Sequence, residues 1–159
     1  KGLIEKDLIK YLDKLIKEYK IDTKIIEFEI TETALINNLV ESEKVISKLK
    51  NMGFSVSLDD FGTGYSSINY LKNLPIDKVK FDKILIEDIE KTEKNKILVK
   101  SIIDLAHNLD LEVVAEGVEN KIENKLLDEI DCDYIQGYYY YRPMPIDKIL
   151  LKQNKIKSS

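Results

Sequence analysis

Residues 54–64 read Phe54-Ser55-Val56-Ser57-Leu58-Asp59-Asp60-Phe61-Gly62-Thr63-Gly64, and the architecture of the chain can be inferred from them first. Apolar residues alternate with serines over positions 54–58, as they do in a short β-strand. Two adjacent aspartates and a glycine-containing loop follow directly. Acidic residues at the end of a strand are typical of parallel α/β proteins, in which functional side chains lie at the strand ends.

The same unit of strand and helix recurs on both sides of this stretch. Further strands are predicted at residues 24–30, 78–82, 111–116 and 134–136, and helices at 1–20, 42–51, 94–108 and 122–130. Another helix is expected to be capped by Ser66 or Ser67, and a short closing helix to follow Pro145. Strands that alternate with helices, without hairpins, form right-handed βαβ units. We therefore expect an α/β fold with about five parallel strands.

Composition limits the classes of function. The 159 residues suit one domain, and 25 basic residues are scattered among 29 acidic ones, which argues against a DNA, RNA or anionic-membrane partner. The single cysteine, Cys132, excludes an internal disulfide and favours a reducing, cytoplasmic location. No apolar stretch approaches the ~20 residues of a membrane span, so this segment is not expected to insert into a membrane.

Polar side chains stand at the end of each predicted strand. In chain order they are Glu29, Asp59, Asp60, Lys80, Asp82, Glu116 and Gln136. Strand ends of a parallel array converge on one face, where carboxylates from three strands need cations to remain ionised together. Oxygen ligands without thiolates favour Mg2+ or Mn2+. A lysine beside them can orient a water molecule or offset charge on a phosphoryl group.

Each of these features also has a structural explanation, which the residues alone leave open. An Asp-Asp pair before a glycine-rich loop is more often a helix cap or turn, and Glu29 can be a solvated strand end. Lys80 is more unusual, because a lysine that faces the inside of a barrel needs a partner. The tripeptide Asp60-Phe61-Gly62 also occurs in kinases, but no glycine-rich phosphate loop or catalytic-loop signature accompanies it, so a kinase is excluded.

Five ordered motifs resemble successive signatures of EAL-domain cyclic-di-GMP phosphodiesterases. They are EITE at 29–32, DDFGTGYSS at 59–67, KFD at 80–82, AEGVE at 115–119 and QGY at 136–138. The resemblance implies a partial (β/α)8 TIM-like barrel. A complete barrel takes about 250 residues, so we expect about three N-terminal strands to be absent. Residues 1–152 are then the C-terminal portion of the domain, and residues 153–159 a disordered tail.

The resemblance also implies roles for individual residues. Glu29 and Asp59 match ligands of the first of two Mg2+ or Mn2+ ions, while Asp59, Asp60 and Glu116 match the surroundings of the second. Lys80 matches a lysine that contacts the attacking water, so Lys80 and Glu116 are the expected catalytic residues. Substrate-binding or supporting positions are matched by Glu32, Phe61, Gly62, Thr63, Gly64, Glu119 and Gln136. Glu32 matches a glutamate that steadies the loop 61–67.

The implied activity is the metal-dependent hydrolysis of cyclic di-GMP to pGpG by a longer, homodimeric parent protein. The fragment alone is expected to be inactive, because neither the Glu-Ala-Leu glutamate nor a metal-binding asparagine of the family precedes Lys1. A non-catalytic cyclic-di-GMP receptor or interaction module is the alternative. The retained acidic residues and Lys80 favour the enzyme, since a receptor has no need to activate a nucleophile.

Four positions depart from the family pattern, namely Asp110, Asp131, Ile84 and Tyr141. Asp110 and Asp131 follow helices where the family commonly has glycine. They predict either aspartates in the left-handed backbone region or a different helix ending.

Overall fold

The computed structural model describes residues 2–63 and 71–150, with side chains from residue 7 onward. Gly64, the expected caps Ser66 and Ser67, and the expected tail at 153–159 lie outside the described residues.

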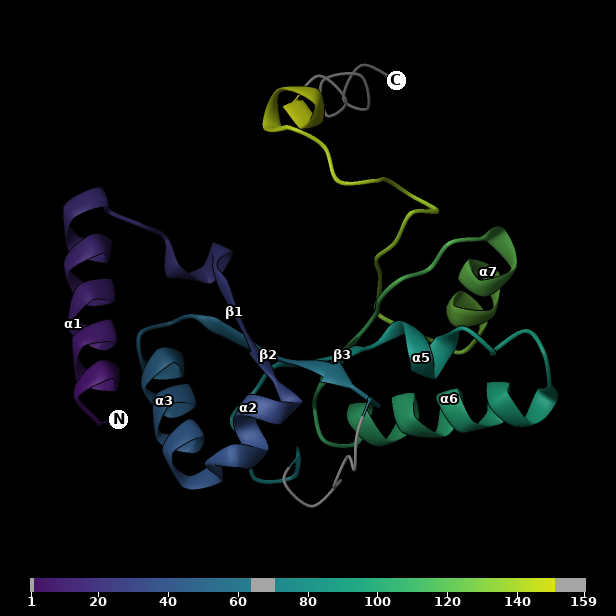
Figure 1. The fold of residues 1–159 in the computed structure, drawn as a ribbon, viewed down its shortest axis with the longest axis horizontal. Helices are drawn as coiled ribbons and strands as arrows, with labels where there is room; N and C mark the ends of the chain where they lie inside the picture. Colours follow the sequence, from purple (N-terminus) through teal and green to yellow (C-terminus); the bar gives the residue numbers. More distant parts are fainter. Residues whose placement is uncertain (1, 64–70, 151–159) are drawn as a thin grey trace.

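Five parallel strands form one sheet, as the sequence predicts. The strands are β1 Glu27–Thr31, β2 Ser55–Phe61, β3 Lys78–Phe81, β4 Glu112–Ala115 and β5 Tyr134–Ile135, and they lie in the order of the sequence. The helices are α1 Gly2–Tyr19, α2 Glu32–Asn37, α3 Leu39–Asn51, α5 Lys83–Ile86, α6 Glu93–His107 and α7 Lys121–Glu129, with a 3-10 turn at Thr23–Ile25. Residues 146–150 are also helical and stand apart from the sheet in Figure 1.

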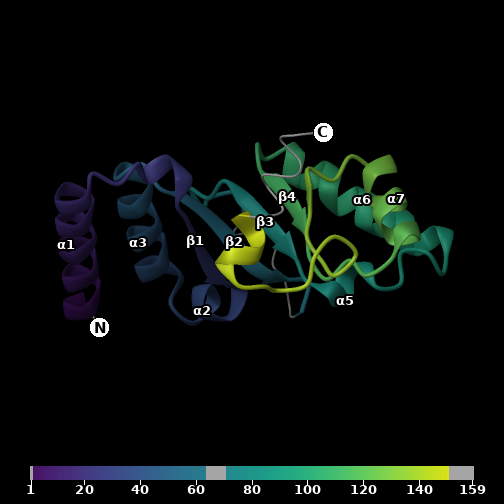
Figure 2. The same ribbon diagram turned by 90° about the horizontal axis from the view of Figure 1, so that it is seen from above.

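The two faces of the sheet differ in polarity. Helices α3 and α6 lie along one face, and Figures 1 and 2 show them flanking the strands. Alternate residues of each strand point toward these helices, among them the fully buried Val56, Val79 and Phe81. Burying each such side chain contributes about 1.5–3 kcal/mol. The opposite face, here called the polar face, is formed by Glu27, Glu29, Ser57, Lys78, Lys80 and Glu112.

Two short helices and part of β2 were not predicted. Thr31 Oγ1 accepts from Ala34 N at 3.3 Å and begins α2, and Asp82 Oδ1 accepts from Ile84 N at 2.8 Å and begins α5. Strand β2 continues beyond Leu58, so Asp59 and Asp60 lie in the strand and not in a loop. The register between β2 and β3 shifts between Leu58 and Phe61, as in a β-bulge.

Four helical segments end in the same way. The residues in the left-handed region are Lys20, Gly53, Asp110 and Asp131, with φ of 51°, 89°, 59° and 63°. In each case the next residue donates its N–H to a carbonyl five residues earlier, for example Leu111 N to Ala106 O at 3.0 Å and Cys132 N to Leu127 O at 3.1 Å. This is a Schellman ending, which favours glycine at the left-handed position. Of the two alternatives for Asp110 and Asp131, the left-handed aspartate is the one observed.

Glycine substitutions at these two aspartates are expected to stabilise the fold. A left-handed residue with a β-carbon costs roughly 1–2 kcal/mol, and the greater freedom of glycine in the unfolded chain cancels part of the gain. We expect Asp110→Gly and Asp131→Gly each to raise the free energy of unfolding by about 1 kcal/mol, measured by urea denaturation. A loss of stability in both variants would show that the aspartate side chains contribute more than the backbone strain costs.

Asp77 fixes the connection between β2 and β3. Its carboxylate accepts from Val56 N at 2.8 Å and from Ser55 Oγ at 3.2 Å, and it forms an ion pair with Lys50. Burial by itself raises the pKa of this carboxyl, but Lys50, the Val56 N–H and Ser55 outweigh burial and lower the pKa below its ordinary 3.8. The ionised form is therefore preferred in the folded state.

This lowered pKa predicts a pH dependence of stability. A carboxyl whose pKa is lower in the folded state stabilises the fold above its unfolded pKa, and the contribution is lost as the pH falls through the folded pKa. We expect Asp77→Asn to cost stability near neutral pH and to lose less than the wild type does on acidification to about pH 3. Urea midpoints across this range test it. Parallel pH profiles of the two proteins would contradict the role of Asp77.

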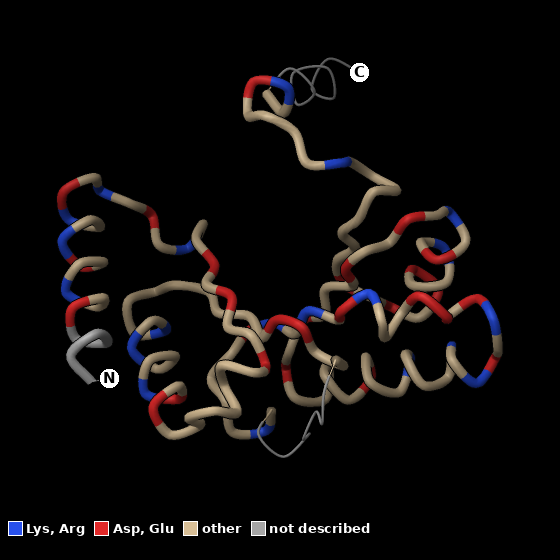
Figure 3. The backbone as a smooth tube through the Cα atoms, viewed as in Figure 1, with Lys and Arg blue, Asp and Glu red and all other residues tan. Residues whose placement is uncertain are grey.

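Charges of both signs are mixed along the helices, as the composition predicts. Figure 3 shows acidic and basic residues interspersed along α1, α3 and α6. Over the described ranges, no helix has both the length and the apolar character needed to cross a lipid bilayer.

Candidate functional site

Lys80 lies at the centre of a group of carboxylates on the polar face. Its Nζ is 2.5 Å from Glu29 Oε1, 2.9 Å from Glu116 Oε1 and 3.2 Å from Asp59 Oδ1. These partners come from β1, from the residue after β4 and from β2, so three strands converge on one ammonium group. The Lys80 side chain is only 7% exposed. The lysine therefore points inward and has the partners that its position requires.

These contacts determine the charge of Lys80. Burial lowers the pKa of a lysine, but the contacts with Glu116, Glu29 and Asp59 outweigh burial and raise the pKa of Lys80 above its ordinary value. Lys80 consequently remains an ammonium through neutral and moderately alkaline pH. It can donate hydrogen bonds and supply positive charge, but it cannot accept a proton.

The register shift in β2 falls at two consecutive acidic residues, Asp59 and Asp60. Asp60 has a left-handed backbone with φ of 60°, and its carbonyl accepts from Thr63 Oγ1 at 3.0 Å. Such backbone strain in a non-glycine residue persists where the surrounding structure imposes it, and it is common at functional sites. Among the described residues, Asp59 Oδ1 is buried and accepts no hydrogen bond, although it lies near Lys80 Nζ. This buried acceptor is available to a ligand or cation.

The acidic residues fit hard divalent cations in their chemistry. All are oxygen donors, and the buried Asp59 Oδ1 has an ion pair with Lys80 but no hydrogen bond among the described residues. Within residues 2–63 and 71–150, however, no three histidine, cysteine or acidic side chains are arranged to hold an ion. Three of the four proposed carboxylate ligands are turned toward Lys80 instead. Binding of a cation there would require the acidic side chains to rearrange around it.

The loops after β4 and β5 are joined by backbone hydrogen bonds. Gln136 N donates to Ala115 O at 2.8 Å, Val118 N to Gln136 O at 3.1 Å and Tyr139 N to Val118 O at 3.0 Å. A β-carbon on Gly137 would lie 2.0 Å from Val118 O, so only glycine allows this approach. The pairing connects the loop that begins at Glu116 to the loop that begins at Gln136.

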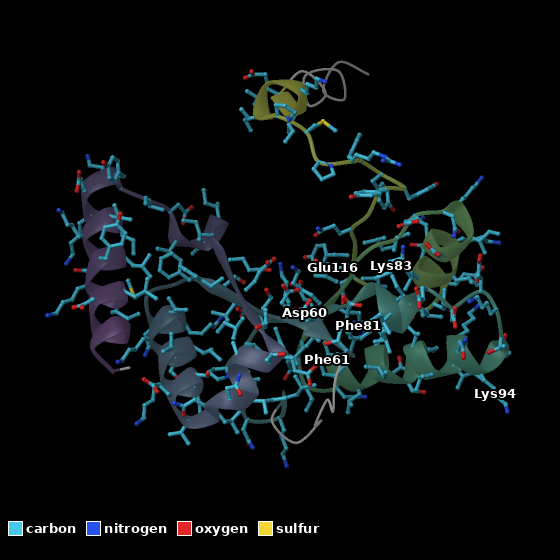
Figure 4. All side chains as sticks on the ribbon, in the orientation of Figure 1. Asp60, Phe61, Phe81, Lys83, Lys94 and Glu116 are labelled. Atoms are coloured by element: carbon cyan, nitrogen blue, oxygen red, sulfur yellow. The ribbon has the colours of Figure 1, made fainter. Side chains whose placement is uncertain are left out.

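The other predicted residues surround this centre at different depths. Glu32 is buried at the start of α2, and the Phe61 ring stacks on Phe81 with centroids 5.8 Å apart. Gly62 has φ of 103°, which requires glycine. Glu119 lies 2.6 Å from Lys83 Nζ, so its carboxylate pairs away from Lys80. Gln136 is exposed. Figure 4 shows Asp60, Glu116 and Lys83 near the middle of the molecule and Lys94 at its edge.

Two lysines near the site were missed from the sequence. Lys78 Nζ lies 2.8 Å from Glu27 Oε2 and 3.8 Å from Glu112 Oε2 on the polar face. Lys78 precedes Lys80 by two residues, so both lysines point to the same side of the strand, and this spacing could have revealed Lys78. Lys83, the first residue of α5, pairs with Glu119 in the loop after β4, and the sequence carries no signal for this contact.

A cavity of about 350 Å³ lies beside β5. Its lining residues are Val114, Tyr134, Ile135, Gln136, Gly137, Tyr140 and Tyr141. Aromatic and aliphatic walls with an amide at one side can accommodate a flat heterocyclic ring.

Comparison with known proteins gives one consistent result. The family model described as the EAL domain matches residues 2–143. The cyclic di-GMP phosphodiesterase NbdA of Pseudomonas aeruginosa is 42% identical over 121 residues, which cover 76% of this chain and 16% of NbdA. The chain spans a fifth or less of the length of the curated relatives compared.

Solved structures agree over the same region. A complex of the PaMucR phosphodiesterase with c-di-GMP has a TM-score of 0.82 and 32% identity, covering 89% of this chain and 57% of that chain. A calcium and cyclic-di-GMP complex of BlrP1 from Klebsiella pneumoniae has a TM-score of 0.76 and 30% identity, covering 82% of this chain and 33% of that chain. The sheet described here thus matches part of a larger barrel.

Proposed function

This chain belongs to the EAL domain family, and we propose that its complete domain hydrolyses one phosphodiester bond of cyclic di-GMP to give linear pGpG. The observation that carries the proposal is the buried Lys80 ammonium, held by carboxylates from three strands at one face. A site that only binds a nucleotide does not need a cation stabilised by three acidic residues. Phosphodiester hydrolysis does, because negative charge increases at the phosphoryl oxygens and at the departing O3′.

Lys80 has a defined role in this proposed reaction. In the proposed mechanism Lys80 stays protonated, donates a hydrogen bond to the attacking water and offsets charge on the phosphoryl group. The water must lose a proton as its oxygen bonds to phosphorus, and the O3′ leaving group must gain one. The first proton passes to solvent, and the proton that O3′ gains as its bond to phosphorus breaks comes from solvent.

The family is generally metal-dependent, and we propose that Glu29, Asp59, Asp60 and Glu116 hold two Mg2+ or Mn2+ ions. When bound, such ions supply positive charge that activates water and neutralises phosphoryl oxygens. The all-oxygen donor set supports this assignment, as does the buried Asp59 Oδ1, which forms no hydrogen bond with the described residues. The BlrP1 structure is a calcium complex, which supports a divalent cation in this family.

The proposed substrate is supported by the cavity next to Gln136. Tyr134, Tyr140 and Tyr141 give it an aromatic lining that suits a guanine ring, and the Gln136 amide can donate and accept hydrogen bonds at the edge of the base. Glu32, Phe61, Gly62, Thr63, Gly64 and Glu119 are proposed to support the site. We further propose that the parent protein acts as a homodimer in the cytoplasm.

The test is to assay the complete EAL protein that contains this chain. Purified protein is incubated with cyclic di-GMP and Mg2+ or Mn2+, and pGpG is measured by chromatography. Stoichiometric conversion that EDTA abolishes is the expected result. Binding of cyclic di-GMP without the appearance of pGpG would overturn the proposal and identify a receptor.

A further inference from the structure

The loop after β4, residues 116–119, carries Glu116 and is held by several neighbouring elements. Glu116 N donates to Phe81 O of β3 at 3.0 Å. Glu119 N donates to Glu123 Oε2 of α7 at 2.9 Å. Hydrogen bonds with residues 136–139 hold Val118. One more contact comes from Lys83, the first residue of α5.

Lys83 crosses this loop with the whole length of its side chain. A β-carbon on Gly117 would lie 2.8 Å from Lys83 Cβ, 3.1 Å from Cγ and 3.2 Å from Cδ, so the aliphatic part of Lys83 lies directly against Gly117. Beyond it, Nζ reaches Glu119 Oε1 at 2.6 Å. Gly117 has φ of 72°. Glycine therefore both permits this backbone and leaves room for the lysine. Figure 4 shows Lys83 and Glu116 close together.

We propose that Lys83 is a positioning residue that holds Glu116 in place for catalysis by fastening the loop 116–119 to α5. The inference rests on the proposed function. The aliphatic part of Lys83 limits movement of Gly117, the residue next to Glu116, while the ammonium fixes Glu119 at the other end of the loop. Both side chains of this ion pair are about half exposed, so the pair adds little to global stability. We expect the ion pair between Lys83 and Glu119 to affect the position of Glu116 instead.

The experiment compares Lys83→Met with Lys83→Arg in the complete EAL protein. Methionine keeps a long apolar side chain and removes the charge, whereas arginine keeps the charge. The matched control is Lys96→Met, because Lys96 also forms an ion pair between two elements, 2.8 Å from Glu129 Oε2. The measurements are kcat and KM for cyclic di-GMP in Mn2+, the Tm, and amide hydrogen exchange of residues 116–119.

We expect Lys83→Met to lower kcat about tenfold with little change in KM, less than the ~10²-fold that a 1 Å misplacement can cause. Exchange of the loop amides should accelerate, Lys83→Arg should restore most of the activity, and Lys96→Met should behave as wild type. A raised KM with unchanged kcat would overturn the proposal and make Lys83 a substrate-binding residue. If the wild type does not turn over, the proposed function fails; the exchange rates still decide whether Lys83 fastens the loop, since unchanged exchange in Lys83→Met would refute it.

Discussion

Replacing Lys80 with alanine in the complete EAL protein is expected to lower kcat for cyclic di-GMP by a factor on the order of 10²–10³, with a much smaller change in KM. The reason is that charge on the phosphoryl group increases mainly in the transition state, and an interaction made there appears in kcat. Glu116→Ala should lower kcat similarly, and Asp59→Ala at least as much, because Asp59 is proposed to serve both metal ions. Turnover is measured as pGpG formed in Mg2+ or Mn2+.

The control must separate catalysis from folding. Without the ammonium, three carboxylates lose their shared counter-charge, which can cost up to about 3 kcal/mol and less here because Glu29 is half exposed. Cyclic-di-GMP binding in Ca2+ reports whether the variant is folded. Lys78→Ala is the matched control for kcat, since Lys78 lies on the same strand and face but contacts Glu27, Glu112 and the Tyr134 ring and none of the proposed metal ligands. Wild-type turnover in Lys80→Ala would refute the role of Lys80.

Gly137→Ala is expected to destabilise the fold by about 3 kcal/mol, near the upper end for overpacking. The added β-carbon would lie 2.0 Å from Val118 O and 2.4 Å from Val118 N, and these are backbone atoms that cannot move aside as a flexible side chain can. The two loops would have to separate, which breaks the hydrogen bonds from Val118 N to Gln136 O and from Tyr139 N to Val118 O.

Urea denaturation of the chain measures this loss directly. Tyr138→Ala is the neighbouring control, because the Tyr138 side chain is 54% exposed and a surface substitution usually changes stability by less than about 0.5 kcal/mol. An unfolding midpoint of Gly137→Ala equal to that of wild type would mean that the loops are not in contact as described.

Much of the fold could be predicted from short-range patterns. The alternation of strands and helices reads directly from the spacing of apolar residues, and Gly53 marks the end of α3. The short helices α2 and α5 could not be predicted from such patterns. Their N-caps, Thr31 and Asp82, follow directly on strands, and in the sequence they cannot be told from ordinary strand-end residues. Helices of four to six residues have almost no periodicity to detect.

The site was predictable to the extent that strand ends converge. Lys80 and its three acidic partners follow from one residue per strand and the parallel order of the sheet. The contact between Lys83 and Glu119 joins residues 36 positions apart, one at the start of α5 and one in the loop before α7, and their relative placement depends on how these helices pack. The register shift at Asp59 and Asp60 depends on how β2 pairs with β3. Neither arises from local sequence.

The register shift in β2 has a consequence for how this strand tolerates change. In a regular strand, two residues that point to the same side are separated by an even number of positions. Leu58 and Phe61 are both buried in the core and are separated by three positions. The extra residue at the bulge shifts the alternation of side chains, so that Asp59 and Asp60 both fit between the buried residues Leu58 and Phe61. Deleting Asp60 would restore regular pairing and keep Phe61 on the core side, but it would remove one of the two consecutive carboxylates. The extra residue in this stretch is therefore explained by the carboxylate pair and not by the packing of the core.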